Sequence, residues 1–278
     1  MIIFRKLNLL TVLGLLFLNG CGMPPFDPQA VKDRFPESAP PISNFITVGE
    51  RSFHYVSYGD PQKPLVVFIH GSPGSWEAYG HLMSDPDLFE KAHIISVDRP
   101  GYGKSDKGAW ETSLKVQADL IAKMIEKEGK GKKAFVIGHS YGGPVMAKLA
   151  MDHPDKVSKM MMLAASVDPE LEMLKWFNYA ADTWLASALL PSLWKVSNKE
   201  ILPLKSELEL MEPLWSQITS PIIVVQGTED TLVPEGNAYF IKEKAVNADV
   251  RLVILQGENH FLPWNQVALI KQEILSTL

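Results

Sequence analysis

The sequence predicts an α/β protein built on a mostly parallel, doubly wound sheet, and three observations lead to this prediction. Short, uninterrupted apolar runs recur along the chain, segments of helical periodicity alternate with them, and one long stretch breaks the alternation. Uninterrupted apolar runs are typical of parallel strands buried on both faces, and alternation with helices is typical of a sheet covered on both sides. The length of 278 residues suits one domain with an insertion, or two small domains.

Seven segments have the pattern of strands. The first, 53–58, alternates in polarity, and the others are apolar runs at 65–69, 94–97, 134–137, 160–164, 222–225 and 250–255. Apolar residues recur every three or four positions in 116–125, 145–150 and 267–274, which predicts helices between the strands.

The stretch that breaks the alternation, 167–220, contains no strand-like run. Asp168-Pro169-Glu170 favours the start of a helix, because a capping side chain is followed by proline in the first turn. An apolar stripe then extends to Pro191. We therefore expect a helical insertion between two strands of the sheet.

Residues 1–20 have the three-part pattern of an export signal, with Arg5 and Lys6 preceding an apolar run that is too short to span a bilayer. The residues that follow, Leu18-Asn19-Gly20-Cys21, resemble a bacterial lipobox. This resemblance implies cleavage before Cys21, lipidation of Cys21 and anchoring to a membrane of the cell envelope. A plain signal peptide and an uncleaved N-terminal anchor are the alternatives.

The residues after Cys21 predict how the domain is attached. Six prolines lie between residues 22 and 41, which favours an extended spacer over residues 21–47. By resemblance to bacterial lipoproteins, Gly22 is not the aspartate that favours retention in the inner membrane. If the host has two membranes, we therefore expect the outer one.

Composition excludes several classes of function. The formal net charge is −5 and no basic patch is visible, so we expect no nucleic-acid partner. Cys21 is the single cysteine, which rules out an internal disulfide and any cysteine cluster that could hold a metal. We expect neither a metal nor a cofactor.

The candidate nucleophile is Ser140, in Gly138-His139-Ser140-Tyr141-Gly142. This Gly-x-Ser-x-Gly pattern directly follows a predicted buried strand and precedes a predicted helix, which is the tight turn that such a serine requires. The alternative is a glycine-rich turn without chemistry.

A serine hydroxyl needs a base and a third group that orients the base. His260 follows the strand at 250–255, at the edge of the sheet where such enzymes carry their functional groups. Asp230 follows the strand at 222–225 and completes the chain order serine, acid, histidine. Asp168 also follows a strand and is the competing acid, although it has a second reading as a helix cap.

Two main-chain N–H groups are candidates for an oxyanion hole. One is that of Tyr141, directly after the nucleophile, and the other comes from the loop His70-Gly71-Ser72-Pro73-Gly74. Because proline has no N–H group, Ser72 is the best placed donor in that loop, with Gly74 behind it, unless the loop only turns the chain.

Five motifs resemble, in order and spacing, those of α/β-hydrolase-fold enzymes: HGSPGS, DRPGYGKS, GHSYGG, GTEDTLVP and GENHFLPW. The resemblance covers roughly residues 48–278. It implies a core formed by residues 48–166 and 221–278, with the insertion at 167–220 as a helical cap over the active site.

The resemblance also implies a reaction. Relatives that open epoxides or remove halides use an aspartate nucleophile, whereas this chain has Ser140. The leading prediction is hydrolysis of a carboxylic ester through an acyl-enzyme. Hydrolysis of an amide or a carbon–carbon bond and cofactor-free perhydrolysis remain alternatives. An alternative of another class is a non-catalytic binding lipoprotein, which should lack a triad member.

The aromatic residues of the insertion bear on the substrate. Trp176, Phe177, Trp184 and Trp194 indicate an apolar cap interior, and hence a small and apolar substrate, unless they only pack the cap against the body.

Overall fold

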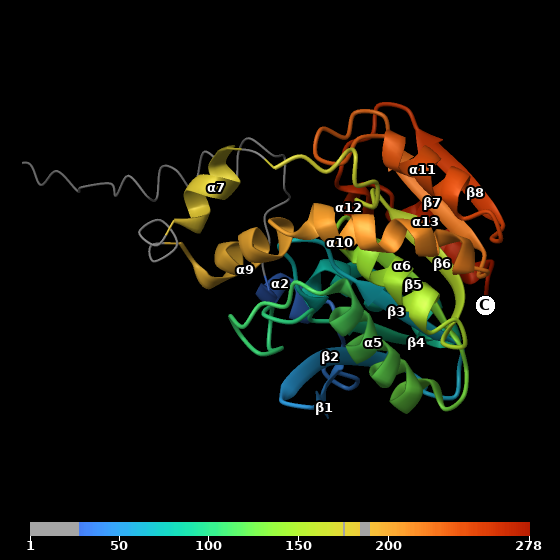
Figure 1. Cartoon of the computed structure of the whole chain (residues 1–278). Coiled ribbons are helices and arrows are strands. Elements are labelled where there is room, and N and C mark those ends of the chain that lie inside the picture. The colour runs from blue at the N-terminus through green and yellow to red at the C-terminus, as the bar shows by residue number, and fades with distance from the viewer. Residues whose placement is uncertain (1–27, 175, 184–189) are drawn as a thin grey trace, which may run out of the picture.

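The computed structural model describes residues 28–174, 176–183 and 190–278 (Figure 1). Its described part contains an eight-stranded sheet in the order β1-β2-β4-β3-β5-β6-β7-β8. The strands β1 and β2 and the strands β2 and β4 pair antiparallel, and all later pairs are parallel. The strands are β1 (Ile42–Val48), β2 (Arg51–Gly59), β3 (Leu65–Ile69), β4 (His93–Val97), β5 (Ala134–His139), β6 (Val157–Leu163), β7 (Ile222–Gly227) and β8 (Val250–Leu255).

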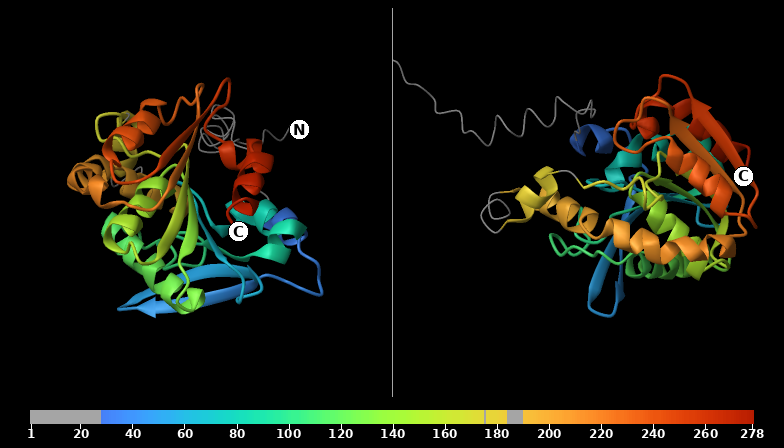
Figure 2. Two further views of the ribbon diagram at one scale, coloured as in Figure 1. Left: turned by 90° about the vertical axis from the view of Figure 1, so that its right-hand side faces the viewer. Right: turned by 45° about the horizontal axis from the view of Figure 1, so that its top comes forward.

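Helices cover both faces of the sheet, as the left view of Figure 2 shows. Near the N-terminus and after β3 lie α2 (Pro28–Lys32), η1 (Trp76–Tyr79), α3 (Gly80–Met83) and α4 (Pro86–Lys91). The helices of the middle of the chain are α5 (Leu114–Gly129), α6 (Gly142–Asp152), α7 (Trp176–Asp182), α9 (Ser192–Ile201), α10 (Leu204–Met211) and η2 (Glu212–Gln217). The last three are α11 (Gly236–Lys244), α12 (Leu262–Asn265) and α13 (Val267–Leu275).

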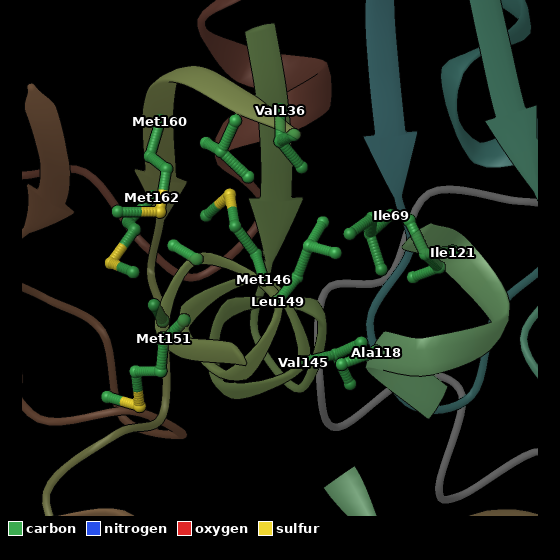
Figure 3. Packing of buried hydrophobic residues seen from close by; sticks show 14 of the residues in the cluster. Ile69, Ala118, Ile121, Val136, Val145, Met146, Leu149, Met151, Met160 and Met162 are labelled. Atoms are coloured by element: carbon green, nitrogen blue, oxygen red, sulfur yellow. The ribbon is translucent and has the colours of Figure 1, made fainter. Parts of the chain in front are cut away.

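The core consists of two apolar layers, one on each face of the sheet. On one face, side chains of α5, α6, α10 and α11 pack against β3, β5 and β6. Figure 3 shows part of this layer, in which Val145 of α6 lies beside Ala118 of α5. On the other face, η1, α3, α4 and α13 pack against alternate residues of the same strands. Strands enclosed in this way need apolar residues at every position, which explains the uninterrupted runs in the sequence.

All seven predicted strands are present, and the strand β1 was not predicted. The sequence prediction placed residues 42–47 in an extended spacer, but they form an edge strand that pairs with β2 along its length. The preceding residues also pack against the domain. Phe35 is buried with its ring 4.9 Å from that of Tyr58, and Val31 lies against Gly80. The prediction of a spacer over residues 21–47 is thus corrected for residues 28–47, because a few apolar anchors among the prolines hold this segment on the body.

The insertion also differs from the predicted cap of residues 167–220. Its second half, α10 and η2, buries Leu204, Leu208, Met211 and Trp215 in the core rather than roofing a site. The helix predicted from Pro169 is a turn instead, and helix α7 begins at Trp176. The N–H groups of Val167 and Asp168 both donate to Asn237 Oδ1, which holds this stretch on the body.

Several predictions concern residues outside the described part of the chain. The export signal, Cys21 and Trp184 lie there, as do the side chains of Trp176 and Phe177. Among the described residues, we find no helix with both the length and the apolar character needed to cross a bilayer.

Candidate active site

Ser140 lies on a strained turn between β5 and α6. Its φ angle is +54°, in the left-handed region that non-glycine residues rarely occupy. The flanking glycines of the motif permit this turn. A Cβ atom on Gly138 would lie 2.6 Å from the carbonyl oxygen of Gly142, and one on Gly142 would lie 2.4 Å from that of Ile69. The motif is therefore explained by the close approach of three main-chain segments.

His260 and Asp230 lie together beyond the ends of β8 and β7. Both are buried, and His260 Nδ1 lies 2.8 Å from Asp230 Oδ2. A carboxylate only accepts hydrogen bonds, so Nδ1 carries the proton and Nε2 is left as the basic nitrogen. Oδ1 of Asp230 accepts the N–H groups of Leu232 and Val233, at 2.9 and 2.8 Å. These bonds fix the carboxylate, which in turn fixes the imidazole.

The electrostatics of Asp230 favour its charged form. Burial alone would raise the pKa of this carboxyl group, but the hydrogen bond and charge of His260 and the two N–H groups outweigh burial and lower the pKa. Asp230 is therefore an anion near neutral pH, as a residue that stabilises an imidazolium must be.

The structure separates Asp230 from its competitor. Asp168 Oδ1 accepts the N–H of Glu170 at 2.9 Å, so this carboxylate stabilises the local turn. His260 is paired with Asp230 and not with Asp168.

Ser140, His260 and Ser72 line one cavity of about 850 Å³. Among the hydrogen bonds of the described residues, none joins the side chains of Ser140 and His260. Such contacts are often long in unliganded enzymes and tighten with substrate bound. The N–H groups of Ser72 and Tyr141 donate to no acceptor among the described residues, so both are free to bind an oxyanion.

The wall of the cavity includes parts of the chain that the sequence did not connect with the site. Ala30, Val31 and Arg34, from α2 and the residues after it, line it together with Leu193 of α9 and Leu232. The segment predicted as a spacer thus forms part of the pocket, and helix α9 of the insertion contributes one apolar side chain to its lining.

Two further histidines support the site and were not singled out from the sequence. His139 Nε2 lies 2.9 Å from the carbonyl oxygen of His260, and its ring packs 4.6 Å from the ring of His260. His70 Nδ1 lies 2.7 Å from the carbonyl oxygen of Gly71. Burial, together with the charge of His260 for His139 and of Arg99 for His70, lowers the pKa of each to about 3. Both rings are therefore neutral near pH 7 and hold the backbone of the site.

Comparison with known proteins agrees with this architecture. Residues 64–193 match the family model described as alpha/beta hydrolase fold. A solved structure of 2-hydroxy-6-oxo-6-phenylhexa-2,4-dienoate hydrolase from Rhodococcus superposes with a TM-score of 0.65 at 19% identity, covering 84% of this chain and 98% of that one. At this identity the likeness concerns the fold.

Two proteins that the sequence matches have names with different activities. Mouse epoxide hydrolase 4 is 29% identical over 113 residues, which are 40% of this chain and 31% of that protein, so the match spans about a third of the relative's length. A hydrolase of 2-hydroxy-6-oxononadienedioate from Burkholderia vietnamiensis is 24% identical over 82% of this chain and 91% of its own length. The chain therefore has the α/β-hydrolase fold and is related to hydrolases of that fold.

Proposed function

We propose that this protein is a serine hydrolase that cleaves a carboxylic ester. The observation that carries the proposal is the shared cavity, in which Ser140 on its strained turn lies with His260, whose Nδ1 is paired with Asp230. The unpaired N–H groups of Ser72 and Tyr141 support it, because ester hydrolysis passes through an oxyanion.

The reaction that these residues support has two halves. Ser140 Oγ attacks the ester carbonyl carbon while His260 Nε2 takes the hydroxyl proton, and the N–H groups of Ser72 and Tyr141 stabilise the oxyanion. The intermediate collapses to an acyl-enzyme and expels the alcohol, which takes the proton from His260. Water then attacks the acyl-enzyme with His260 again as the base, releasing the acid and restoring Ser140. Asp230 stabilises the imidazolium in both halves.

A fluorophosphonate probe tests the nucleophile without knowledge of the substrate. We expect stoichiometric labelling of the purified protein, with the adduct mapped to Ser140 by mass spectrometry and absent from Ser140→Ala. An adduct on any other residue, or no adduct, would overturn the proposal. A panel of esters, thioesters and amides assayed alongside then identifies the bond that is cleaved.

A second candidate is hydrolysis of a carbon–carbon bond. One relative, which aligns with 82% of this chain, acts, by its name, on a hydroxy-oxo-dienedioate, which contains no ester or amide bond. Arg34, which lines the cavity, is a cation suited to a carboxylate of such a substrate. Rapid loss of the ultraviolet absorbance of a 2-hydroxy-6-oxo-dienoate, faster than turnover of any ester in the panel, would favour this candidate.

For location, we propose an exported lipoprotein anchored through Cys21, in the outer membrane if the host has two. The lipobox-like residues before Cys21 support this. Metabolic labelling with a fatty acid should tag the wild type and not Cys21→Ser, and fractionation should move the variant out of the membrane fraction. Equal labelling of both proteins would exclude Cys21.

A further inference from the structure

A buried ion pair joins the cap to the loop that contains Ser72. The guanidinium of Arg99, with no exposed surface, donates to both carboxylate oxygens of Glu200 on α9, at 2.6 and 2.8 Å. Its other N–H groups donate to the carbonyl oxygens of His70 and Gly71, at 3.0 and 2.9 Å, and to Gln117 Oε1 at 3.0 Å. All five donors of the guanidinium are thus used, and two of them hold the backbone just before Ser72.

The side chain of Ser72 is held by the same assembly. Its Oγ lies 3.1 Å from the hydroxyl of Tyr102 and 2.8 Å from Ser197 Oγ, and the Tyr102 hydroxyl donates to Glu200 Oε1 at 2.6 Å. Because the Tyr102 hydroxyl donates its one proton to the carboxylate of Glu200, it can only accept a hydrogen bond from the Ser72 hydroxyl. Ser72 then accepts from Ser197. The protons are therefore ordered along one chain that runs from Ser197 through Ser72 and Tyr102 to Glu200.

This ordering assigns a role to each half of Ser72. Its hydroxyl proton is committed to Tyr102 and is not available to a substrate. Its main-chain N–H has no acceptor among the described residues and is the group left to bind an oxyanion.

The residues of α9 that reach the body share one face of the helix. Val196 and Ser197 follow Leu193 by three and four residues, and Glu200 follows Leu193 by seven, two turns of the helix. A Cβ atom on Gly101 would lie 2.8 Å from Val196. Moving α9 away from the body would break both bonds to Glu200 and leave the charge of Arg99 in the body without its counter-charge, which is unfavourable. This helix is thus a fixed part of the cap.

We propose that helix α9 positions the oxyanion donor of the active site, with Ser197 and Glu200 as positioning residues that orient the main-chain N–H of Ser72. This inference rests on the proposed serine hydrolase function and adds a contribution of the cap to the rate of acyl transfer. Substitution of Glu200 would leave Arg99 buried and unpaired, so hydroxyl variants provide the cleaner test.

The test is a double-mutant cycle of Ser197→Ala and Ser72→Ala, followed by kcat and KM on p-nitrophenyl butyrate and by the rate constant of fluorophosphonate labelling. Ser72→Ala keeps the N–H group and removes only its tether. We expect each single variant to lower kcat and the labelling rate by at least about fivefold, since small displacements of a catalytic donor are costly. KM should stay within about twofold, and the double variant should equal Ser72→Ala alone, since Ser197 acts through Ser72.

Ser192→Ala is the matched control, because it makes the same change at an exposed position of the same helix. Unchanged kcat in Ser197→Ala, additive losses in the double variant, a loss confined to KM, or an equal loss in Ser192→Ala would each overturn the proposal. Failure of the wild type to be labelled at Ser140 is a different outcome, which removes the proposed function and this inference with it.

Discussion

The region of β1 and β2 contains a second serine–histidine–aspartate set, which invites comparison with the candidate active site. His54 Nδ1 lies 2.7 Å from Asp98 Oδ2, and His54 Nε2 lies 2.8 Å from Ser43 Oγ. These are the connections of a catalytic triad, and they are complete in this set. At the candidate site, by contrast, the bond between Ser140 and His260 is not formed in the structure.

The surroundings of the two serines differ more than their hydrogen bonds. Ser43 lies exposed on an edge strand whose main chain is paired with β2, and it does not line the cavity of the candidate site. Ser140 lies at the start of a helix, in the cavity, next to the unpaired N–H group of Tyr141. A complete chain of hydrogen bonds alone therefore does not mark a candidate nucleophile. Ser140 differs from Ser43, which satisfies a buried histidine, in its enclosed volume and in the free donors for an oxyanion beside it.

The largest expected effect separates the two serines directly. Ser140→Ala should lower kcat by about 10⁵- to 10⁶-fold, because the nucleophile itself is lost, while the melting temperature stays close to that of the wild type. Ser43→Ala should keep kcat within about twofold. Steady-state kinetics and thermal unfolding of the purified variants test both predictions. Retention of more than about a tenth of kcat in Ser140→Ala, or a fluorophosphonate adduct on Ser43, would reverse the comparison.

The two aspartates should differ in kind. Asp230→Asn should lower kcat by about 10³- to 10⁴-fold with little loss of stability, because the imidazole loses its orientation and its counter-charge. Asp168→Asn is the matched control and should change little, since the amide oxygen of asparagine can accept the N–H of Glu170 as the carboxylate does. A large loss only at Asp168 would move the acid to the end of β6.

Asp98→Asn should instead cost stability. Asp98 is buried and accepts hydrogen bonds from the N–H groups of Trp76 and Lys104 and from His54 Nδ1. In the asparagine variant, the NH2 group would face one or more of these donors, and no hydrogen bond could form there. We expect a loss of about 2–4 kcal/mol in the free energy of unfolding by urea, with kcat per folded molecule within about threefold. A large fall in kcat without a fall in stability would show that the second set is catalytic.

The pKa of Asp98 leads us to expect that the free energy of unfolding depends on pH. Burial alone would raise the pKa of Asp98, but the hydrogen bonds from His54 and from two N–H groups lower it. A carboxyl group with a lowered pKa in the folded state stabilises the protein above its unfolded pKa of about 3.9, and this contribution is lost as the pH falls through the folded pKa. The acid side of the stability curve should therefore be flatter in Asp98→Asn than in the wild type.

Because the candidate active site is enclosed, we expect it to select substrates by the length of their acyl chain. If the cavity admits an acyl chain, each methylene buried contributes roughly 0.8 kcal/mol, about fourfold in kcat/KM, until the cavity is full. We expect kcat/KM on p-nitrophenyl esters to rise over short acyl chains, peak and fall for long ones, without activation at a lipid–water interface. A steady rise to long chains with strong interfacial activation would indicate a lipase whose cap opens.

The sequence predicted those parts of the molecule that local patterns determine. Buried parallel strands need continuous apolar runs, so seven strands could be found, and a glycine-flanked turn with His260 and Asp230 after later strands identified the candidate triad. The strand β1 was not predicted because it is an edge strand, exposed on one face, with polar residues such as Asn44 and Thr47. Its neighbours are prolines, which favoured a spacer.

The supporting network could not be predicted for another reason. Arg99 and Glu200 lie 101 positions apart, and no periodicity or motif connects a loop residue of the body with a residue of the insertion. In the sequence, Arg99 stands only as one residue of the motif DRPGYGKS, which indicates no partner in the insertion. Pairing of buried charges depends on how the cap docks, which only the tertiary structure specifies.

The smallest expected effect concerns the stability that the second set provides. Ser43→Ala removes the partner of His54 Nε2, but the vacated position lies at an exposed strand, where water can replace the hydroxyl. We therefore expect a loss of about 1 kcal/mol or less, or about 2–4 °C in melting temperature, with turnover unchanged. Ser52→Ala on the neighbouring strand β2 is the matched control, because its hydroxyl makes no hydrogen bond to a described residue. If Ser43→Ala proves as costly as Asp98→Asn, the hydroxyl must stabilise the buried pair far more than one exposed partner should. The second serine–histidine–aspartate set would then stabilise the fold as a single cooperative unit.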